Sequence, residues 1–152
     1  MKKKLAFSTL EILLTVFIFA CVFAFSLLYT QLGVLRTDLK TQATILETHL
    51  REAQNNASSG KEDGAFGVHF NAGSYVLFKG SSYDPLASTN FEVLLPTVLT
   101  IESVSLQGGG DEVIFDSPLG TTGEYGTFIL NSSRTDQTLL FTITSLGHVS
   151  YE

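Results

Sequence analysis

The sequence predicts an α+β fold: a long N-terminal helix, membrane-spanning in its first half, packed on an antiparallel β-sheet or a small two-sheet β-sandwich. An apolar segment runs from Phe7 to Leu28 and continues as a helical repeat. After it, short apolar runs alternate with turn residues, which is typical of strands. We therefore expect a leader at 1–6, an apolar helix half at 7–28, an amphipathic helix half at 29–55 and a β-rich domain at 60–152.

The first helix half is predicted from its length and its flanking charges. A helix over 7–28 would be about 33 Å long at roughly 1.5 Å per residue, enough to cross the hydrocarbon core of a bilayer. Lys2, Lys3 and Lys4 precede it. Because basic residues stay on the cytoplasmic side, we expect a single pass through the inner membrane, with the N-terminus cytoplasmic and the C-terminal domain outside.

The second helix half is predicted from apolar residues at intervals of three and four. No proline precedes Pro85, so the helix is expected to continue to about Gln54. One apolar stripe along it would pack on the β-rich domain. The stripe consists of Leu32, Leu35, Leu39, Ala43, Leu46, Leu50 and Ala53.

The remaining chain reads as a loop followed by strands. The segment from Asn55 to Gly64 has loop composition. Alternating apolar residues between Gly, Pro and Asn turns then predict eight strands, the first two joined as a hairpin. The expected strands are Phe66–Phe70, Ser74–Lys79, Phe91–Leu95, Val98–Leu106, Glu112–Asp116, Gly126–Asn131, Thr138–Thr144 and His148–Tyr151.

Glu11 is the one charged residue of the apolar segment. A carboxylate in a membrane helix costs on the order of 2.5–3.5 kcal/mol at a central position, so a partner charge is expected. Cleavage between Ala6 and Phe7 would free an α-amino group, which is cationic at neutral pH. The amine of one copy and Glu11 of a neighbour would then fix the register of an assembly.

The run Ala6-Phe7-Ser8-Thr9-Leu10-Glu11 resembles the prepilin cleavage motif of type IV pilins and type II secretion pseudopilins. The resemblance implies that a prepilin peptidase cuts between Ala6 and Phe7 and N-methylates Phe7, with Glu11 as the residue for assembly and register. Ala6 replaces the usual glycine, and Ser8 precedes the Thr-Leu pair. An ordinary signal peptide has a shorter apolar core, and a lipobox ending at Cys21 would be followed by polar residues.

The C-terminal third is similar to GspH/FimT-type minor pseudopilins, through turn and strand positions at Pro118, Gly120, Gly147 and Val149. The resemblance implies a structural subunit of a type IV pilus or a type II secretion pseudopilus. Its partners would be the prepilin peptidase, other pilin or pseudopilin subunits bound through the N-terminal helix, and the inner-membrane assembly machinery. The assembled subunit would then be part of a filament outside the cytoplasm.

Two alternatives stay open: a DNA-binding minor pilin for DNA uptake, and a plain membrane-anchored β-domain. DNA binding requires a basic patch. The chain has a net charge of −6, and its end carries Arg134 against Asp136 and Glu152, so nucleic acid is not an expected partner. Cys21 is the lone cysteine, which excludes an intramolecular disulfide.

The sequence predicts neither an enzyme nor a cofactor. No Gly-x-Ser-x-Gly elbow or phosphate-binding loop occurs. The histidines are scattered without zinc-ligand spacing: His49, His69 and His148. Asp111, Glu112 and Asp116 lie near a glycine turn, and whether they bind calcium is left open, with a solvated acidic turn as the simpler interpretation.

Overall fold

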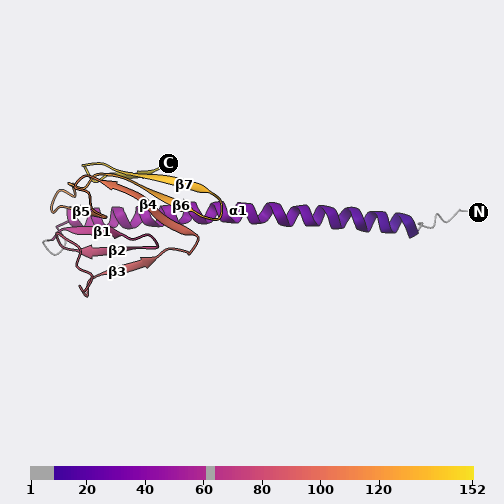
Figure 1. The fold of residues 1–152 in the computed structure, drawn as a ribbon, viewed down its shortest axis with the longest axis horizontal. Helices are drawn as coiled ribbons and strands as arrows, with labels where there is room; N and C mark the ends of the chain where they lie inside the picture. Colours follow the sequence, from indigo (N-terminus) through magenta and orange to yellow (C-terminus); the bar gives the residue numbers. More distant parts are fainter. Residues whose placement is uncertain (1–8, 61–63) are drawn as a thin grey trace, which may run out of the picture. The chain divides into compact units, whose positions relative to one another are not determined.

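The computed structural model describes residues 9–60 and 64–152, and in these ranges one long helix, α1 (Thr9–Ser58), is followed by eight strands (Figure 1). The chain divides into two compact units, Met1–Thr37 and Asp38–Glu152. The strands all belong to the second unit. They are β1 (Phe66–Phe70), β2 (Ser74–Lys79), β3 (Phe91–Leu94), β4 (Leu99–Leu106), β5 (Glu112–Phe115), β6 (Gly126–Ser132), β7 (Gln137–Ile143) and β8 (Val149–Tyr151).

The strands form two four-stranded antiparallel sheets, ordered β3-β2-β1-β5 and β4-β6-β7-β8. In β1 and β2, Phe70 pairs with Tyr75 across the short turn between them, as the sequence predicts. The bounds of all eight strands lie within one residue of those predicted. Alternation of apolar residues is a local signal, which explains this agreement.

One face of α1 in the second unit is buried in the same core as both sheets (Figure 1). The buried residues follow each other at intervals of four and three, which keeps them on one side of a helix with 3.6 residues per turn. The predicted apolar stripe is therefore confirmed from Leu39 onward. Its buried members are Leu39, Ala43, Leu46, Leu50 and Ala53, and the buried Ala57, which was not predicted, extends the stripe by one turn.

The helix ends at Ser58, beyond the predicted boundary near Gln54. Gly60 has a φ of 63°, a left-handed conformation that glycine adopts without steric cost. Its N–H donates to the carbonyl of Ala57 at 3.1 Å, a hydrogen bond typical of a helix C-terminus. The polar composition of 55–58 had predicted a loop, but these residues form the last helical turn.

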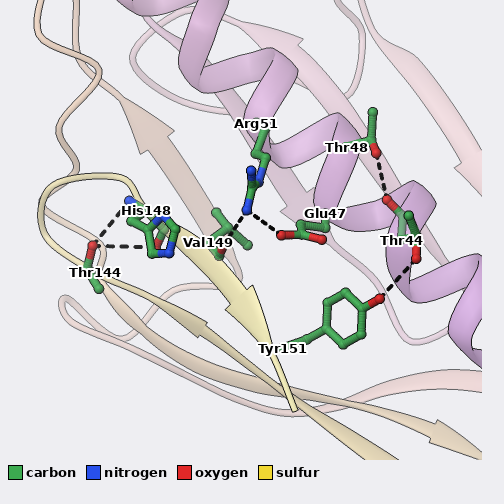
Figure 2. Close-up of polar contacts among 8 residues, drawn as sticks. All are labelled: Thr44, Glu47, Thr48, Arg51, Thr144, His148, Val149 and Tyr151. Atoms are coloured by element: carbon green, nitrogen blue, oxygen red, sulfur yellow. Dashed lines mark hydrogen bonds and ion pairs between the residues drawn. The ribbon is translucent and has the colours of Figure 1, made fainter.

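Polar side chains attach the outer face of α1 to β8 (Figure 2). Arg51 donates to the Glu47 carboxylate at 2.6 Å and to the carbonyl of Val149 at 3.3 Å. Thr44 lies about one helical turn before Glu47, and its hydroxyl is 3.0 Å from that of Tyr151, which is two residues after Val149 on β8. These contacts fix the position of α1 along β8, because each of them forms at only one register between the helix and the strand.

Gln54 joins α1 to two loops that are distant in sequence. Its side-chain N–H donates to the carbonyls of Gly120, at 3.3 Å, and Leu146, at 3.1 Å. Gly147 lies against this junction with a φ of 80°. A Cβ atom on Gly147 would lie 2.2 Å from the carbonyl oxygen of Gly120 and 2.5 Å from the amide nitrogen of Gln54, so only glycine fits.

On the other side of the helix, His49 contacts Tyr75 of β2. The Tyr75 hydroxyl lies 2.7 Å from Nδ1 of His49, and the two rings are 5.7 Å apart. Burial raises the pKa of Tyr75 to about 12, because the phenolate would lose its hydration. The hydroxyl is therefore protonated at neutral pH and can donate to a neutral imidazole.

The predicted fold class needs correction. It described one long helix, membrane-spanning in its first half, packed on a sheet or small sandwich. Instead, the chain divides between Thr37 and Asp38, and the part of α1 that belongs to the second unit shares a core with the strands. Two four-stranded sheets share the core with that segment, because each sheet has an apolar face that one helix face covers only in part.

The membrane assignment is corrected as well. A helical span needs about 20 predominantly apolar residues. Across residues 9–60 and 64–152, no helix combines the length and the apolar character needed to cross a membrane. The expected single-pass position in the inner membrane, and with it the description of 7–28 as a transmembrane helix, is therefore not supported.

Replacing Gly147 by alanine should destabilise the second unit. We expect a loss of about 2–4 kcal/mol in the free energy of unfolding, from left-handed strain and from the overlap with Gly120 and Gln54. Urea unfolding followed by near-ultraviolet circular dichroism of the buried aromatic residues would measure it. Gly123→Ala is the matched control, because no atom lies within 4 Å of its added Cβ. Equal stability of the two variants would contradict the role given to Gly147.

Tyr75 should make the fold sensitive to alkali. Burial raises its pKa from the ordinary 10.0 to about 12 in the folded state, so its stabilisation is present below pH 10 and is lost as the pH rises towards 12. Tyr75→Phe should reduce the loss of folding stability at alkaline pH. Near neutral pH it should lower the free energy of unfolding by about 1 kcal/mol, because the hydrogen bond to His49 is missing. Urea midpoints measured from pH 8 to 12 would test this, with the exposed Tyr125→Phe as control.

Candidate functional site

The first unit carries a helix surface that is apolar and exposed. Ten large apolar side chains between Leu10 and Phe23 are exposed to between 52% and 75% of their area. In the part of the chain that the structure describes, no comparable run exists. The exposed side chains are Leu10, Ile12, Leu13, Leu14, Val16, Phe17, Ile18, Phe19, Val22 and Phe23.

These side chains surround the helix rather than forming a stripe. Successive residues of an α-helix are rotated by about 100°, so a run such as Val16-Phe17-Ile18-Phe19 points in four different directions. A helix that is apolar on all sides is stable only where apolar groups surround it. The first unit therefore has a surface built to be covered on every side, which we call the apolar helix surface.

Glu11 is the acidic residue of this surface, and it lies in the first described turn of α1. A negative charge there interacts favourably with the positive end of the helix dipole. Glu11 is exposed, and Thr15, Ile18 and Val22 follow it at helical spacing on the same side of the helix. Glu11 is thus placed to meet a group of a neighbouring molecule.

Ala6 and Phe7, the residues of the predicted cleavage and methylation, lie outside the described residues. The chemistry assigned to them therefore stays a prediction.

The acidic residues considered for calcium are not brought together. Asp111 lies before β5 and Asp116 after it, at opposite ends of a four-residue strand about 13–16 Å long. Glu112 instead accepts a hydrogen bond from the backbone N–H of Tyr83 at 3.2 Å. Within residues 9–60 and 64–152, no three His, Cys, Asp or Glu side chains form a group suited to hold a metal ion.

The three histidines have separate structural surroundings. His49 binds Tyr75 between α1 and β2. His69 stacks on Tyr83 with ring centroids 4.2 Å apart. His148 lies in the last hairpin, where its backbone N–H donates to the Thr144 hydroxyl at 3.1 Å (Figure 2). None of them shares a site with another.

The DNA-binding alternative finds no geometric support. Arg134 is exposed in the turn between β6 and β7, with exposed Asp136 two residues further along. A single cation beside an acid does not provide the basic surface that a phosphate backbone requires.

Sequence reasoning missed one exposed apolar feature. Phe128 and Phe141 are fully buried in the core. Phe91 and Leu94 of β3, however, are 61% and 75% exposed. The available signal was the strand Phe91-Glu92-Val93-Leu94 itself, which has apolar residues on both of its faces and so departs from strict alternation.

No family model, curated protein or solved structure matches this chain. The resemblance to pilins, pseudopilins and type II secretion proteins therefore receives no support from known families, and the description of the chain as a transmembrane protein is corrected as stated above. The exposed apolar helix surface and Glu11 remain as the features that indicate a function.

The apolar helix surface should drive self-association. Phe17→Lys and Phe23→Lys lie on different sides of the helix, and each should weaken association of the full-length chain in water by about 10- to 100-fold, as expected for losing one buried phenylalanine. Sedimentation velocity over a range of concentrations would measure this. Leu86→Lys is the control, because Leu86 is 91% exposed in the second unit. Association that is insensitive to both helix variants would contradict the role of this surface.

Proposed function

We propose that this protein is a structural subunit of a helical filament, assembled through its N-terminal helix after cleavage between Ala6 and Phe7. The observation that carries the proposal is the apolar helix surface from Leu10 to Phe23, exposed on every side and interrupted by Glu11.

Hydrophobic burial supplies the driving force. Fully burying a large apolar side chain stabilises by about 1.5–3 kcal/mol, so the ten exposed side chains represent on the order of 15–30 kcal/mol. A dimer would cover one side of the helix, whereas a bundle of neighbouring helices covers all sides. A repeated contact that does not close on itself extends into a filament.

Glu11 supplies the register. Helices that are uniformly apolar can slide along one another, because every register buries a similar area. A carboxylate inside the bundle is costly unless a cation lies beside it. One fixed stagger between subunits satisfies this requirement, which selects a single assembly from many.

Cleavage would create the cation. The motif from Ala6 to Glu11, which resembles that of prepilins, predicts a new N-terminus at Phe7. Its α-amino group is protonated at neutral pH and stays basic after a single N-methylation. An uncut chain would instead carry an uncharged peptide bond at this position, so a prepilin peptidase would control entry into the filament.

The second unit would form the part of the subunit that contacts solvent and neighbours. Its core is complete by itself, since both sheets and the stripe from Leu39 to Ala57 are buried together. Assembly through the helix therefore leaves the β-rich unit folded and able to carry a specific surface.

Glu11→Leu tests the mechanism when the full-length chain is co-expressed with a prepilin peptidase and with major subunits of a pilin-like filament. Intact-mass analysis should find an N-methylated N-terminus at Phe7 in both wild type and variant. The amount of Glu11→Leu in sheared, pelleted filaments should fall at least about tenfold, since the amine loses its partner.

Thr15→Leu is the matched control, because Thr15 lies one turn further on the same side of the helix and carries no charge. It should enter filaments like the wild type. Incorporation of Glu11→Leu at the wild-type level would disprove the register mechanism, and a chain that still begins at Met1 would disprove the cleavage.

A further inference from the structure

Strand β3 has a free backbone edge. Leu95 donates its N–H to Gly73 at 3.0 Å, and the next pairs along the strands are Ser74 with Leu94 and Tyr75 with Val93. In an antiparallel ladder every second residue bonds the neighbouring strand. Phe91 and Val93 therefore direct their backbone groups towards β2, whereas Glu92 and Leu94 direct theirs outward.

The other three sheet edges are each engaged by the protein itself. An exposed edge invites pairing with another chain, and folded proteins usually cover it. In this protein, side chains or loops bond the outer edges of β5, β4 and β8. The contacts are Ile114 N–H to the Glu124 carboxylate at 3.3 Å, Ile101 N–H to the Ala72 carbonyl at 2.9 Å, and Arg51 to the Val149 carbonyl at 3.3 Å.

The outward groups of Glu92 and Leu94 have no such contact among residues 9–60 and 64–152. β3 also contains no lysine and no proline, the residues that commonly protect an edge. The edge therefore presents two N–H and two C=O groups in the arrangement that an added strand requires.

Apolar side chains flank this edge on both faces of the sheet. Leu94 is exposed on one face, and Phe91 is exposed on the face that looks towards α1. Phe91 also lines a cavity of about 290 Å³ together with Leu77, Phe66 and Ala53. An added strand could bury an apolar side chain on each face.

Charge distinguishes between possible strands. Glu92 lies on the edge strand, and the second unit is strongly acidic, because Lys2, Lys3, Lys4 and Arg36 precede it while Glu11 is the only acid that does. Two copies brought edge to edge would repel each other. A strand with a basic residue opposite Glu92 would be attracted instead.

We propose that the outer edge of β3 binds an extended segment of a different protein, which pairs with the backbone of Glu92 and Leu94 as a fifth strand. The bound segment carries apolar residues next to Phe91 and Leu94 and a lysine or arginine opposite Glu92. This site lies in the second unit and does not depend on filament assembly through Glu11.

Leu94→Pro tests the backbone pairing. Proline removes the outward N–H of residue 94 and leaves the bonds between β2 and β3 in place, since Leu94 donates none of them. Leu94→Thr is the matched control, because it shortens the apolar side chain but keeps the N–H. The probe is a short peptide with blocked termini, in which valine, threonine and lysine alternate. It is added to the full-length chain in mild detergent.

The wild-type chain should bind this peptide with a Kd on the order of 100 µM, and Leu94→Pro should weaken binding at least about tenfold, whereas Leu94→Thr should weaken it only about two- to threefold. Hydrogen exchange of the wild type gives a second readout that needs no variant. The amides of Glu92 and Leu94 should exchange more slowly when the peptide is present.

Three results would overturn the proposal. The first is no binding by the wild type up to about 1 mM peptide. The second is unchanged exchange at Glu92 and Leu94 with peptide bound. The third is protection of these amides by a second copy of the chain, seen as concentration-dependent exchange without peptide.

Discussion

The β-rich unit depends on burial of one face of α1 between two sheets. Each sheet has four strands and an apolar face that must be buried against another element. The stripe from Leu39 to Ala57 closes the space between them, and the contact of Phe70 with Phe128 joins the two sheets directly. Phe128 of β6 lies 4.5 Å from Phe70 of β1 and 4.7 Å from Phe141 of β7, measured between ring centroids.

The same helix has two different relations to its surroundings. In the second unit the buried apolar residues of α1 lie on one side of the helix, and the two sheets of the same unit cover them. Between Leu10 and Phe23 the apolar residues occupy every side and are exposed. Because the hydrophobic effect does not distinguish between partners, this surface requires contacts from other molecules. In the proposed assembly, the charge of Glu11 would restrict which contacts are acceptable, because a buried carboxylate is costly without a cation beside it.

Backbone hydrogen bonds add a second kind of specificity. The outer edges of β4, β5 and β8 each have a backbone group bonded by a loop or by a side chain such as Glu124 or Arg51. Gln54 bonds the loops at Gly120 and Leu146 in the same way, and the absence of a side chain at Gly147 allows the close approach. At Glu92 and Leu94 this pattern stops, because within residues 9–60 and 64–152 no loop or side chain bonds their outward backbone groups, which lie beside the exposed side chains of Phe91 and Leu94.

The sequence by itself determined the local structure. Eight strands follow from apolar alternation, and the stripe through Leu46 and Leu50 follows from helical spacing, because both patterns reflect neighbours a few residues apart. The motif around Glu11 likewise identified the most informative described residue of the candidate site, while Ala6 and Phe7 stay predictions. The membrane assignment was wrong for the described residues, because no helix among them combines the length and the apolar character that a membrane span needs.

Only the tertiary structure decided which strands are neighbours and which residues meet. Two contacts, of His49 with Tyr75 and of Gln54 with Gly120, join parts of the chain separated by tens of residues. The exposure of Phe91 likewise depends on how distant elements are arranged around it. Such contacts depend on how two sheets and a helix share one core, and no pattern within a short window encodes that arrangement. Burial fixed the sheet order, and the sheet order in turn determined that β3 has the free edge.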